Sequence, residues 1–598
     1  MYKTTSTREI TDAISKCRLA FLFVAITSGL INILYLTGSF FMLEVYDRVI
    51  PSRSLPTLIG LGVLAIVLYT FQGLFETLRT RVLGRISGTL DEAIAHRVFD
   101  VLARAPLTGP SDHDGSLPMR DFDQLRSFLA GPGPSAFFDL PWMPIYIVIC
   151  SLFHPLIGVA AVAGLVVLFL LTLLSDWTTS KQIKASVQYG SRRYLLAEAG
   201  RRNAEVLAAM GMRRQFGARW AKANREYLAI QQQVADVGGS IASLTKVFRM
   251  CLQSGVLALG AYLVINNLAT GGVIIASSIL VARALAPAET VIGNWKGFIQ
   301  ARQSWKRLSE ILNKNAPEPE LQALPVPSQV ISVENVSIAP PGSRRIVVHG
   351  ATFALQAGQG VGIIGPSASG KSSLVRAMVG IWPCAHGTVR IDEAALDQWT
   401  SSELGPHIGF LPQEVELFGG TIAENIARFE PGATSELIIA AAQAAGVHSL
   451  ILRLSEGYET VIGEGGLGLS AGQRQRIGLA RALYGDPFLV VLDEPNANLD
   501  HEGESALTDA IISVRKRGGV CVVVAHRPSA LAALDMVMLI SEGRIQAFGP
   551  KDEVLRRVLK PASAGETAEA DADGPRPRPT VQLRAEPVPG SLSLQESA

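Results

Sequence analysis

The segment Gly365-Pro-Ser-Ala-Ser-Gly-Lys-Ser372 directly follows the apolar run Gly360-Val-Gly-Ile-Ile364. It fits the pattern G-x-x-x-x-G-K-[ST], in which a strand leads into a glycine-rich loop and then into a helix. The backbone N–H groups of such a loop, and the N-terminus of the helix after it, converge on phosphate oxygens. We therefore expect a nucleotide site built from Gly365, Pro366, Ser367, Ala368, Ser369, Gly370, Lys371, Ser372 and Ser373.

An acidic pair further along the chain supports this interpretation. The apolar run Phe488-Leu-Val-Val-Leu492 has the character of a buried strand, and it ends in Asp493-Glu494. An NTPase needs such carboxylates for its metal ion and for its attacking water. The two segments together predict hydrolysis of a nucleoside triphosphate.

Composition separates the chain into a membrane part and a cytosolic part. The 598 residues have a mean hydropathy of +0.28, which is high for a soluble protein, and the long apolar runs lie before about residue 300. The formal net charge is only +2, and no basic cluster is interleaved with aromatic residues, so we expect no nucleic-acid partner. The five cysteines form no C-x-x-C pair and are expected to be small buried hydrophobes.

The apolar runs predict six membrane crossings, because about 20 residues of helix span the hydrocarbon core. His154-Pro155 is expected to break one long run into a tight hairpin. The loops after the second and fourth helices are rich in arginine and lysine, which places them and both termini in the cytoplasm. A soluble protein with buried core helices is the alternative, and the number of long apolar runs disfavours it. The expected helices are 19–42, 57–74, two within 137–174, 247–265 and 272–295.

Five regions follow from these patterns. They are an N-terminal cytoplasmic segment (1–18), a transmembrane domain (19–310), a proline-containing linker (311–329), a cytosolic domain (330–560) and a disordered tail (561–598). The two long cytoplasmic loops have helical patterns and should project well below the bilayer. We expect segments 118–127 and 209–216, near the middles of these loops, to contact the cytosolic domain; ordinary loops are the alternative.

The cytosolic domain alternates strand and helix patterns, as an α/β nucleotide-binding fold does. After the phosphate loop come Phe410-Leu-Pro-Gln413, Leu469-Ser-Ala-Gly-Gln473, Asp493-Glu-Pro495, Asn496-Ala-Asn-Leu-Asp500 and Val522-Val-Val-Ala-His526. This ordered set resembles the ABC transporter ATPases. Its most specific part is the pentapeptide 469–473, which we call the signature segment. The resemblance implies a six-helix all-α transmembrane domain fused to an α/β P-loop ABC nucleotide-binding domain.

The same resemblance implies roles for individual residues, with ATP and Mg²⁺ as cofactors. In that family Glu494 would polarise the attacking water and His526 would contact the γ-phosphate, although a histidine at a strand end can also be purely structural. The implied catalytic residues are Lys371, Gln413, Glu494 and His526, and the implied Mg²⁺ ligands are Ser372, Gln413 and Asp493. Pro340 stands where the family usually has an aromatic residue on the adenine, so stacking on the base should be weaker.

A homodimer follows from the resemblance, because the chain has one phosphate loop and one signature segment. In the family's head-to-tail arrangement, the signature segment of one subunit closes over the nucleotide held by the other. The residues that would complete the nucleotide site are Ser470, Gly472, Gln473 and Asp500.

Several segments resemble the type I secretion ATPase/permeases that export proteases, lipases and repeat-in-toxin proteins from Gram-negative bacteria. They are Phe40 to Ser54, Phe138-Asp-Leu-Pro-Trp142, Gly293-Asn-Trp-Lys296 and Pro340-Pro-Gly342. This resemblance implies a multi-pass inner-membrane protein in contact with lipid, working with a periplasmic membrane-fusion adaptor, an outer-membrane channel and an unfolded secreted protein. Two alternatives stay open: a stand-alone exporter of lipid, glycan or drug, and an ATP-regulated scaffold, which the presence of Glu494 disfavours.

Arg283 is a charge within the sixth apolar run. A charged side chain at the bilayer centre costs on the order of 3 kcal/mol unless it faces water or a partner. We hypothesise that Arg283 lines the translocation path; the alternative is that it snorkels or pairs with Glu289.

Overall fold

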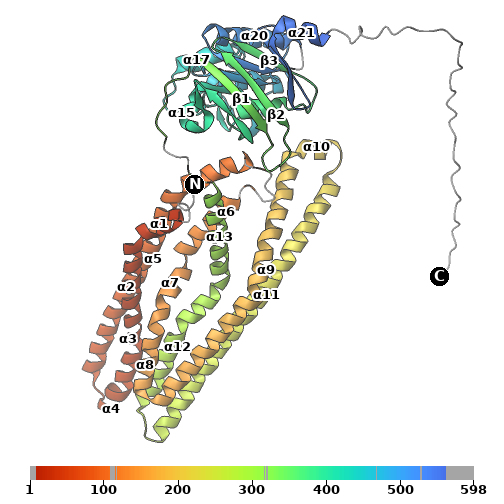
Figure 1. Ribbon diagram of the computed structural model, residues 1–598. Helices are drawn as coiled ribbons and strands as arrows, with labels where there is room; N and C mark the ends of the chain where they lie inside the picture. Colours follow the sequence, from red (N-terminus) through yellow and green to blue (C-terminus); the bar gives the residue numbers. More distant parts are fainter. Residues whose placement is uncertain are drawn as a thin grey trace, which may run out of the picture.

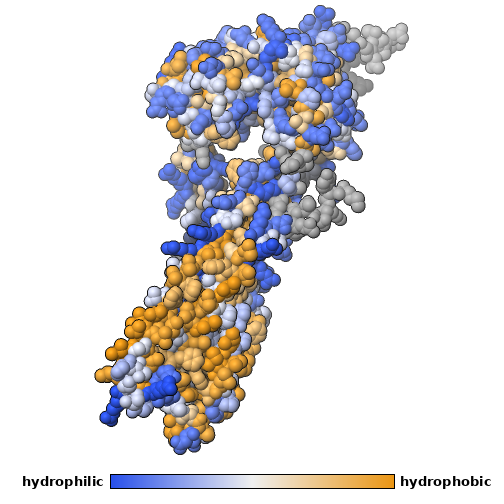
Figure 2. All heavy atoms as spheres, turned by 90° about the vertical axis from the view of Figure 1, so that its left-hand side faces the viewer, coloured by the Kyte–Doolittle hydropathy of each residue, from blue (hydrophilic) through white to orange (hydrophobic). Residues whose placement is uncertain are grey.

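The computed structural model describes residues 8–107, 109, 115, 117–315, 317, 321–466, 468–525 and 528–559. The chain forms an elongated helical bundle that carries an α/β domain at one end (Figure 1). The apolar surface covers the part of the bundle far from the α/β domain, and the surface turns polar toward it (Figure 2). The predicted tail, 561–598, lies outside the described residues.

The bundle is built from long helices. Their bounds are α1 Arg8–Lys16, α2 Arg18–Leu34, α3 Leu36–Glu44, a π-helix Val45–Val49, α4 Ile50–Ser52, α5 Leu55–Arg104, α6 Leu117–Ala130, α7 Pro132–Asp139, α8 Met143–Phe153, α9 Pro155–Arg202, α10 Ala204–Ala209, α11 Arg213–Ile265, α12 Gly271–Gly293 and α13 Trp295–Lys314. Among the described residues, six helical stretches are long and apolar enough to cross a membrane, which confirms the predicted number. They are Arg18–Ser52, Leu55–Leu107, Pro132–Phe153, Pro155–Arg202, Arg213–Ile265 and Gly271–Gly293.

Three of the helices run far beyond a bilayer. α5, α9 and α11 have 50, 48 and 53 residues, and at 1.5 Å per residue each is roughly 70 to 80 Å long. α9 and α11 lie side by side, with α10 at the end nearest the α/β domain (Figure 1). The predicted break at His154 is confirmed, because this residue is extended (φ −165°, ψ 137°) and its Nδ1 accepts a hydrogen bond from the N–H of Leu156.

The segment 118–127 belongs to the bundle, and its contact with the α/β domain stays a prediction. It lies inside α6, where Phe122 and Leu125 are buried in a cluster with residues of α5 and α13. The chain approaches the α/β domain at Gly109, where an added Cβ would lie 3.1 Å from the backbone N of Gly342. The other predicted segment, 209–216, does contain the turn between α10 and α11.

The α/β domain contains three sheets. Two of its sheets are large, and the third is a small antiparallel pair, β7-β8. A six-stranded sheet has the order β12-β11-β3-β10-β9-β6, in which β12 alone is antiparallel to its neighbour, and a four-stranded antiparallel sheet has the order β2-β1-β4-β5. The strands are β1 Val330–Ile338, β2 Val348–Gln356, β3 Gly360–Ile364, β4 His386–Ile391, β5 Ala394–Ala395, β6 Ile408–Leu411, β7 Gly420–Thr421, β8 Val461–Ile462, β9 Leu489–Asp493, β10 Val520–Val524, β11 Met536–Ser541 and β12 Arg544–Pro550.

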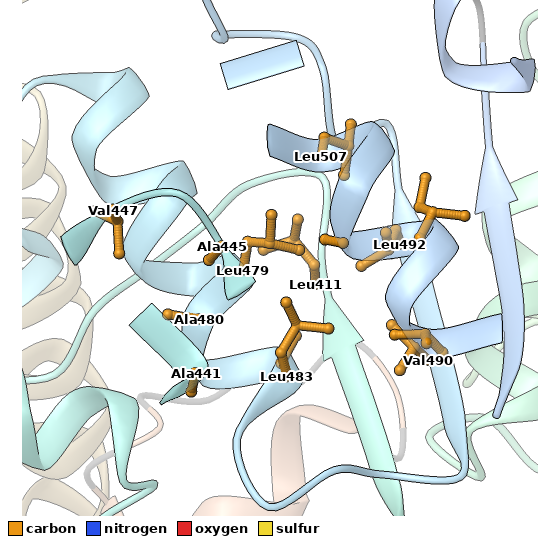
Figure 3. Packing of buried hydrophobic residues seen from close by; sticks show 14 of the residues in the cluster. Leu411, Ala441, Ala445, Val447, Leu479, Ala480, Leu483, Val490, Leu492 and Leu507 are labelled. Carbon is orange, nitrogen blue, oxygen red and sulfur yellow. The ribbon is translucent and has the colours of Figure 1, made fainter. Parts of the chain in front are cut away.

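Helices cover the sheets and enclose the core. They are α14 Lys371–Met378, α15 Ser401–Leu404, α16 Ile422–Ile426, α17 Ser435–Ala444, α18 His448–Leu452, α19 Ala471–Leu483, α20 His501–Lys516 and α21 Lys551–Leu559. One apolar cluster joins α17, α19 and α20 to the sheet through Leu411, Leu479 and Leu492 (Figure 3). Because β3, β9 and β10 are buried along almost their whole length, the ends of these strands are held in fixed positions.

Candidate active site

The phosphate loop joins β3 to α14, as its sequence predicts. Gly365, Ala368 and Gly370 have positive φ angles of 148°, 62° and 99°, and α14 begins at Lys371. An added Cβ on Gly365 would lie 2.0 Å from the carbonyl oxygen of Ile540, so only glycine fits at this position. The loop therefore turns sharply and leaves its backbone close to the helix N-terminus, where anions bind.

Lys371 and Ser369 make this loop suitable for phosphates. The Lys371 Nζ donates hydrogen bonds to the carbonyl oxygens of Gly365 (3.0 Å) and Pro366 (2.8 Å), so the ammonium group lies over the loop. Burial lowers the pKa of Lys371, while the carboxylates of Glu494 and Asp493 act in the opposite direction. The buried Ser369 hydroxyl has no hydrogen-bond partner among the described residues. A phosphate group would supply acceptors for both side chains, so these residues fit a bound nucleotide.

Ser372 and Asp493 meet at the predicted metal position. The Ser372 hydroxyl donates a hydrogen bond of 3.3 Å to Asp493 Oδ1. β3 and β9 are separated only by β10 in a parallel sheet, so their carboxyl ends bring the two residues together. Burial raises the pKa of Asp493, and the hydrogen bond from Ser372 partly opposes that shift. A buried carboxylate next to a hydroxyl offers the hard oxygen ligands that Mg²⁺ prefers.

Glu494 follows β9 in a left-handed conformation with φ of 52°. Its N–H donates to the carbonyl oxygen of Val524 (3.1 Å), and its Oε2 accepts a hydrogen bond from Gln413 Nε2 (3.2 Å). Such a conformation is strained for a non-glycine residue and persists only where the surroundings enforce it. The structure thus brings together Lys371, Ser372, Gln413, Asp493 and Glu494. His526 lies outside the described residues.

The signature segment forms the start of α19. Ser470 caps this helix, because its Oγ accepts from the N–H of Gln473 (3.2 Å) and the Gln473 Oε1 accepts from the N–H of Ser470 (2.8 Å). Gly472 approaches the carbonyl oxygen of Asn498, which would lie 2.8 Å from an added Cβ. Among the described residues, no hydrogen bond or ion pair joins this segment to the phosphate loop of the same chain.

Asp500 caps α20 rather than lying at the phosphate loop. Its Oδ1 accepts from the N–H of Gly503 (2.9 Å), and it forms an ion pair with the largely buried Arg476. The Gly503 N–H and then Arg476 lower the pKa of Asp500.

Sequence reasoning missed Gln475. This buried residue of α19 donates from Nε2 to the carbonyl oxygen of Pro495 (2.5 Å) and accepts at Oε1 from the N–H of Asn498 (3.2 Å). It therefore connects the signature helix to the segment that follows Glu494. The available signal was a polar residue, later found to be buried, within the helix that begins at the signature segment, because a buried polar side chain needs a hydrogen-bond partner.

Comparison with known proteins agrees with this geometry. Residues 348–497 match the ABC transporter family, and residues 19–285 match the ABC transporter transmembrane region. The chain is 57% identical over 549 residues to the type I secretion system ATP-binding protein PrsD of Rhizobium meliloti (strain 1021), which spans 92% of this chain and 94% of that protein. The chain belongs to the type I secretion ABC transporters.

More distant relatives of this ABC transporter point the same way. The cyclolysin secretion/processing ATP-binding protein CyaB of Bordetella pertussis is 28% identical over 538 residues, which is 89% of this chain and 75% of that protein. A bacterial Atm1-family ABC exporter with ATP bound has a TM-score of 0.78 at 24% identity and covers 92% of this chain and 99% of its own. The predicted family, fold class and ATPase activity coupled to transport are confirmed.

Proposed function

We propose that this multi-pass ABC transporter uses ATP hydrolysis to export an unfolded polypeptide across the bacterial inner membrane. The observation that carries this proposal is the identity of 57% to a type I secretion protein over nearly the whole chain. The Lys371, Ser372, Asp493 and Glu494 arrangement supplies the hydrolytic site that such an exporter needs.

The site geometry supports an assignment of hydrolytic roles. The phosphate loop and Lys371 would hold the β- and γ-phosphates, and Ser372, Asp493 and Gln413 would hold Mg²⁺, which when bound would neutralise charge on the phosphates. Glu494 accepts a hydrogen bond from the attacking water, and the hydrogen bond that Gln413 donates to Glu494 fixes the carboxylate. We also assign the γ-phosphate contact to His526. Pro340 gives the adenine ring of the nucleotide an aliphatic neighbour in place of an aromatic side chain.

A homodimer fits the surfaces that a single chain leaves exposed. Ser470, Gly472, Gln473 and Asp500 would complete the nucleotide site of a second subunit, since among the described residues none of them bonds to the phosphate loop of its own chain. The α9–α11 tip exposes the apolar residues Val206 and Met210, and the α/β domain exposes the neighbouring rings of Phe418 and Phe429. Phe418 closely follows Gln413 in the sequence. Contact between these two surfaces across subunits would bury both and would connect the membrane helices to the hydrolytic site.

The further partners are a periplasmic membrane-fusion adaptor, an outer-membrane channel, membrane lipid and the secreted protein. The names of its relatives support a protein cargo, because CyaB is named for secretion of cyclolysin and LktB for translocation of leukotoxin. The competing function is a stand-alone exporter of lipid, glycan or drug.

Comparison of culture media tests this function. The host strain, a deletion of this gene, and the deletion complemented with either the parental gene or a Lys371→Ala variant are grown in parallel. A protein encoded near this gene should disappear from the deletion medium and return only with the parental gene. Unchanged secreted proteins in the deletion strain would refute polypeptide export, and loss of a surface lipid or glycan would favour the competing function.

A further inference from the structure

Arg283 is exposed, whereas the neighbouring positions on α12 are buried or partly buried. Between residues 272 and 292, all of which the structure describes, Arg283 is the one exposed residue. The helix packs against α3, α7, α8, α9 and α11, which explains the burial of the other positions. Exposure at this single position therefore puts a guanidinium on the surface of an otherwise enclosed membrane helix.

The charge lies deep in the membrane. Arg283 is twelve residues after Gly271, the first residue of α12, which corresponds to roughly 18 Å along the helix. A hydrocarbon core of about 30 Å places this position near its middle. A charged side chain at that depth faces water, a polar cavity or a partner.

The other nearby charges already have partners. Glu289, the acid with which Arg283 was predicted to pair as the alternative, forms an ion pair with Arg249 at 3.0 Å, so that alternative pairing is wrong. Among the described residues, no ion pair joins Arg283 to a carboxylate. Its guanidinium lies over the ring of Tyr35, 4.5 Å from the ring centre.

Tyr35 is itself held in place. Its hydroxyl donates to Glu76 Oε1 at 2.8 Å, and Gln72 Nε2 donates to the same oxygen at 3.0 Å. Tyr35 joins α2 to α3, whereas Gln72 and Glu76 belong to α5. Three membrane segments thus position one exposed cation, while the Glu76 carboxylate is satisfied by neutral donors. We call Arg283, Tyr35, Glu76 and Gln72 the Arg283 cluster.

We propose that Arg283 contacts carboxylates of the transported polypeptide as they pass mid-membrane, with Tyr35 as the residue that positions it. This proposal rests on the proposed export of a polypeptide. A guanidinium binds carboxylates through paired N–H donors. Among the described residues, no carboxylate occupies the donors of Arg283. Lipid phosphates fit less well, because they lie at the bilayer surface, roughly 15 Å from the middle of the core.

Thiol labelling tests whether Arg283 faces an aqueous path. Single cysteines replace Arg283 and Leu285 in a variant whose five native cysteines are substituted, and both proteins in nanodiscs are treated with a charged, membrane-impermeant methanethiosulfonate. Leu285, which is buried on the same helix at nearly the same depth, is the matched control. We expect at least tenfold faster labelling of the Arg283→Cys variant in one or more nucleotide states. Labelling no faster than the control in every state overturns the proposal.

Peptide binding tests the preference for carboxylates. Two unstructured fluorescent peptides of equal length carry either glutamate or lysine at the same positions, and their binding to the full-length transporter in nanodiscs is measured. The acidic peptide should bind roughly tenfold more tightly to the parent, and Arg283→Gln should reduce this difference to within about twofold. Arg283→Lys should retain part of the preference, and Tyr35→Phe should keep it, since the ring remains.

The outcomes separate this proposal from the function on which it rests. Binding of both peptides with no charge preference refutes the role of Arg283 and leaves polypeptide export standing. Binding of neither peptide to the parent counts against polypeptide export and against this proposal together. Retention of anionic phospholipid by the parent and its loss in Arg283→Gln would assign the guanidinium to lipid and overturn the proposal.

Discussion

Glu494→Gln should retain nucleotide binding and lose hydrolysis. The substitution keeps the side-chain length, and its amide oxygen can still accept the hydrogen bond that Gln413 donates to Glu494 at 3.2 Å. The fold of the site should therefore persist. The substitution removes the carboxylate that takes a proton from water. A positioned general base raises the hydrolysis rate by a factor of about 10² to 10⁴. This corresponds to about 3 to 5 kcal/mol of activation free energy.

ATP affinity should not fall in this variant, because a negative charge next to the phosphate site is removed. The same carboxylate favours the charged form of Lys371, whose pKa burial lowers, so its loss makes the ammonium slightly less stable. We expect these two effects to offset each other within about threefold in affinity, as for other partly solvated charges.

The assay combines phosphate release under single-turnover conditions with binding of a fluorescent ATP analogue. Glu414→Gln is the matched control, since Glu414 is the exposed neighbour of Gln413, and its hydrolysis rate should equal that of the parent. Parental hydrolysis by purified Glu494→Gln would show that Glu494 is not the base. Loss of nucleotide binding in the same variant would show that the carboxylate has a structural role instead.

Two further predictions address the dimer and the bundle. A mixed dimer of Lys371→Ala and Ser470→Arg subunits has one composite site with both substitutions and one with neither. Hydrolysis should therefore return in the mixed dimer, although each variant alone is inactive. Crosslinking that finds only monomers in an active preparation would contradict the dimer. Asp121→Ala should lower the free energy of unfolding by about 3 kcal/mol, because it leaves the partly buried Arg307 without its carboxylate. Thermal unfolding measures this effect, and the exposed Asp123→Ala variant should be nearly unchanged.

Local patterns predicted the features that depend on local geometry. The phosphate loop, the break at His154 and the number of crossings follow from glycine spacing, proline and the length of apolar runs. Hydropathy reports only the part of a helix in contact with hydrocarbon. The helical pattern of the cytoplasmic loops predicted that helices project beyond it, and α5, α9 and α11 do continue as single long helices.

Long-range contacts were harder to infer. The segment 118–127 was predicted as a contact element, although the spacing of Phe122 and Leu125 fits one buried helix face, and that face packs into the bundle. The contacts of Gln475 with Pro495 and of Arg283 with Tyr35 join positions that no sequence spacing connects. They depend on how helices meet, which a local pattern does not encode.

The hydrolytic residues follow the most deeply buried strands of the cytosolic domain, and this placement has a physical reason. The left-handed backbone of Glu494 costs roughly 1 to 3 kcal/mol, and burial disfavours the charged form of Asp493. Asp493 is the last residue of β9 and Glu494 follows it. β9 is hydrogen-bonded on one side to β10, a strand whose five residues are fully buried. Burial of one valine side chain contributes roughly 1.5 to 3 kcal/mol. The free energy gained by burying the apolar side chains of β9 and β10 therefore exceeds the cost of the backbone strain at Glu494 and of the buried carboxylate of Asp493. The carboxylates are thus held rigidly, and the movement that accompanies transport must occur between the two domains rather than within the hydrolytic site.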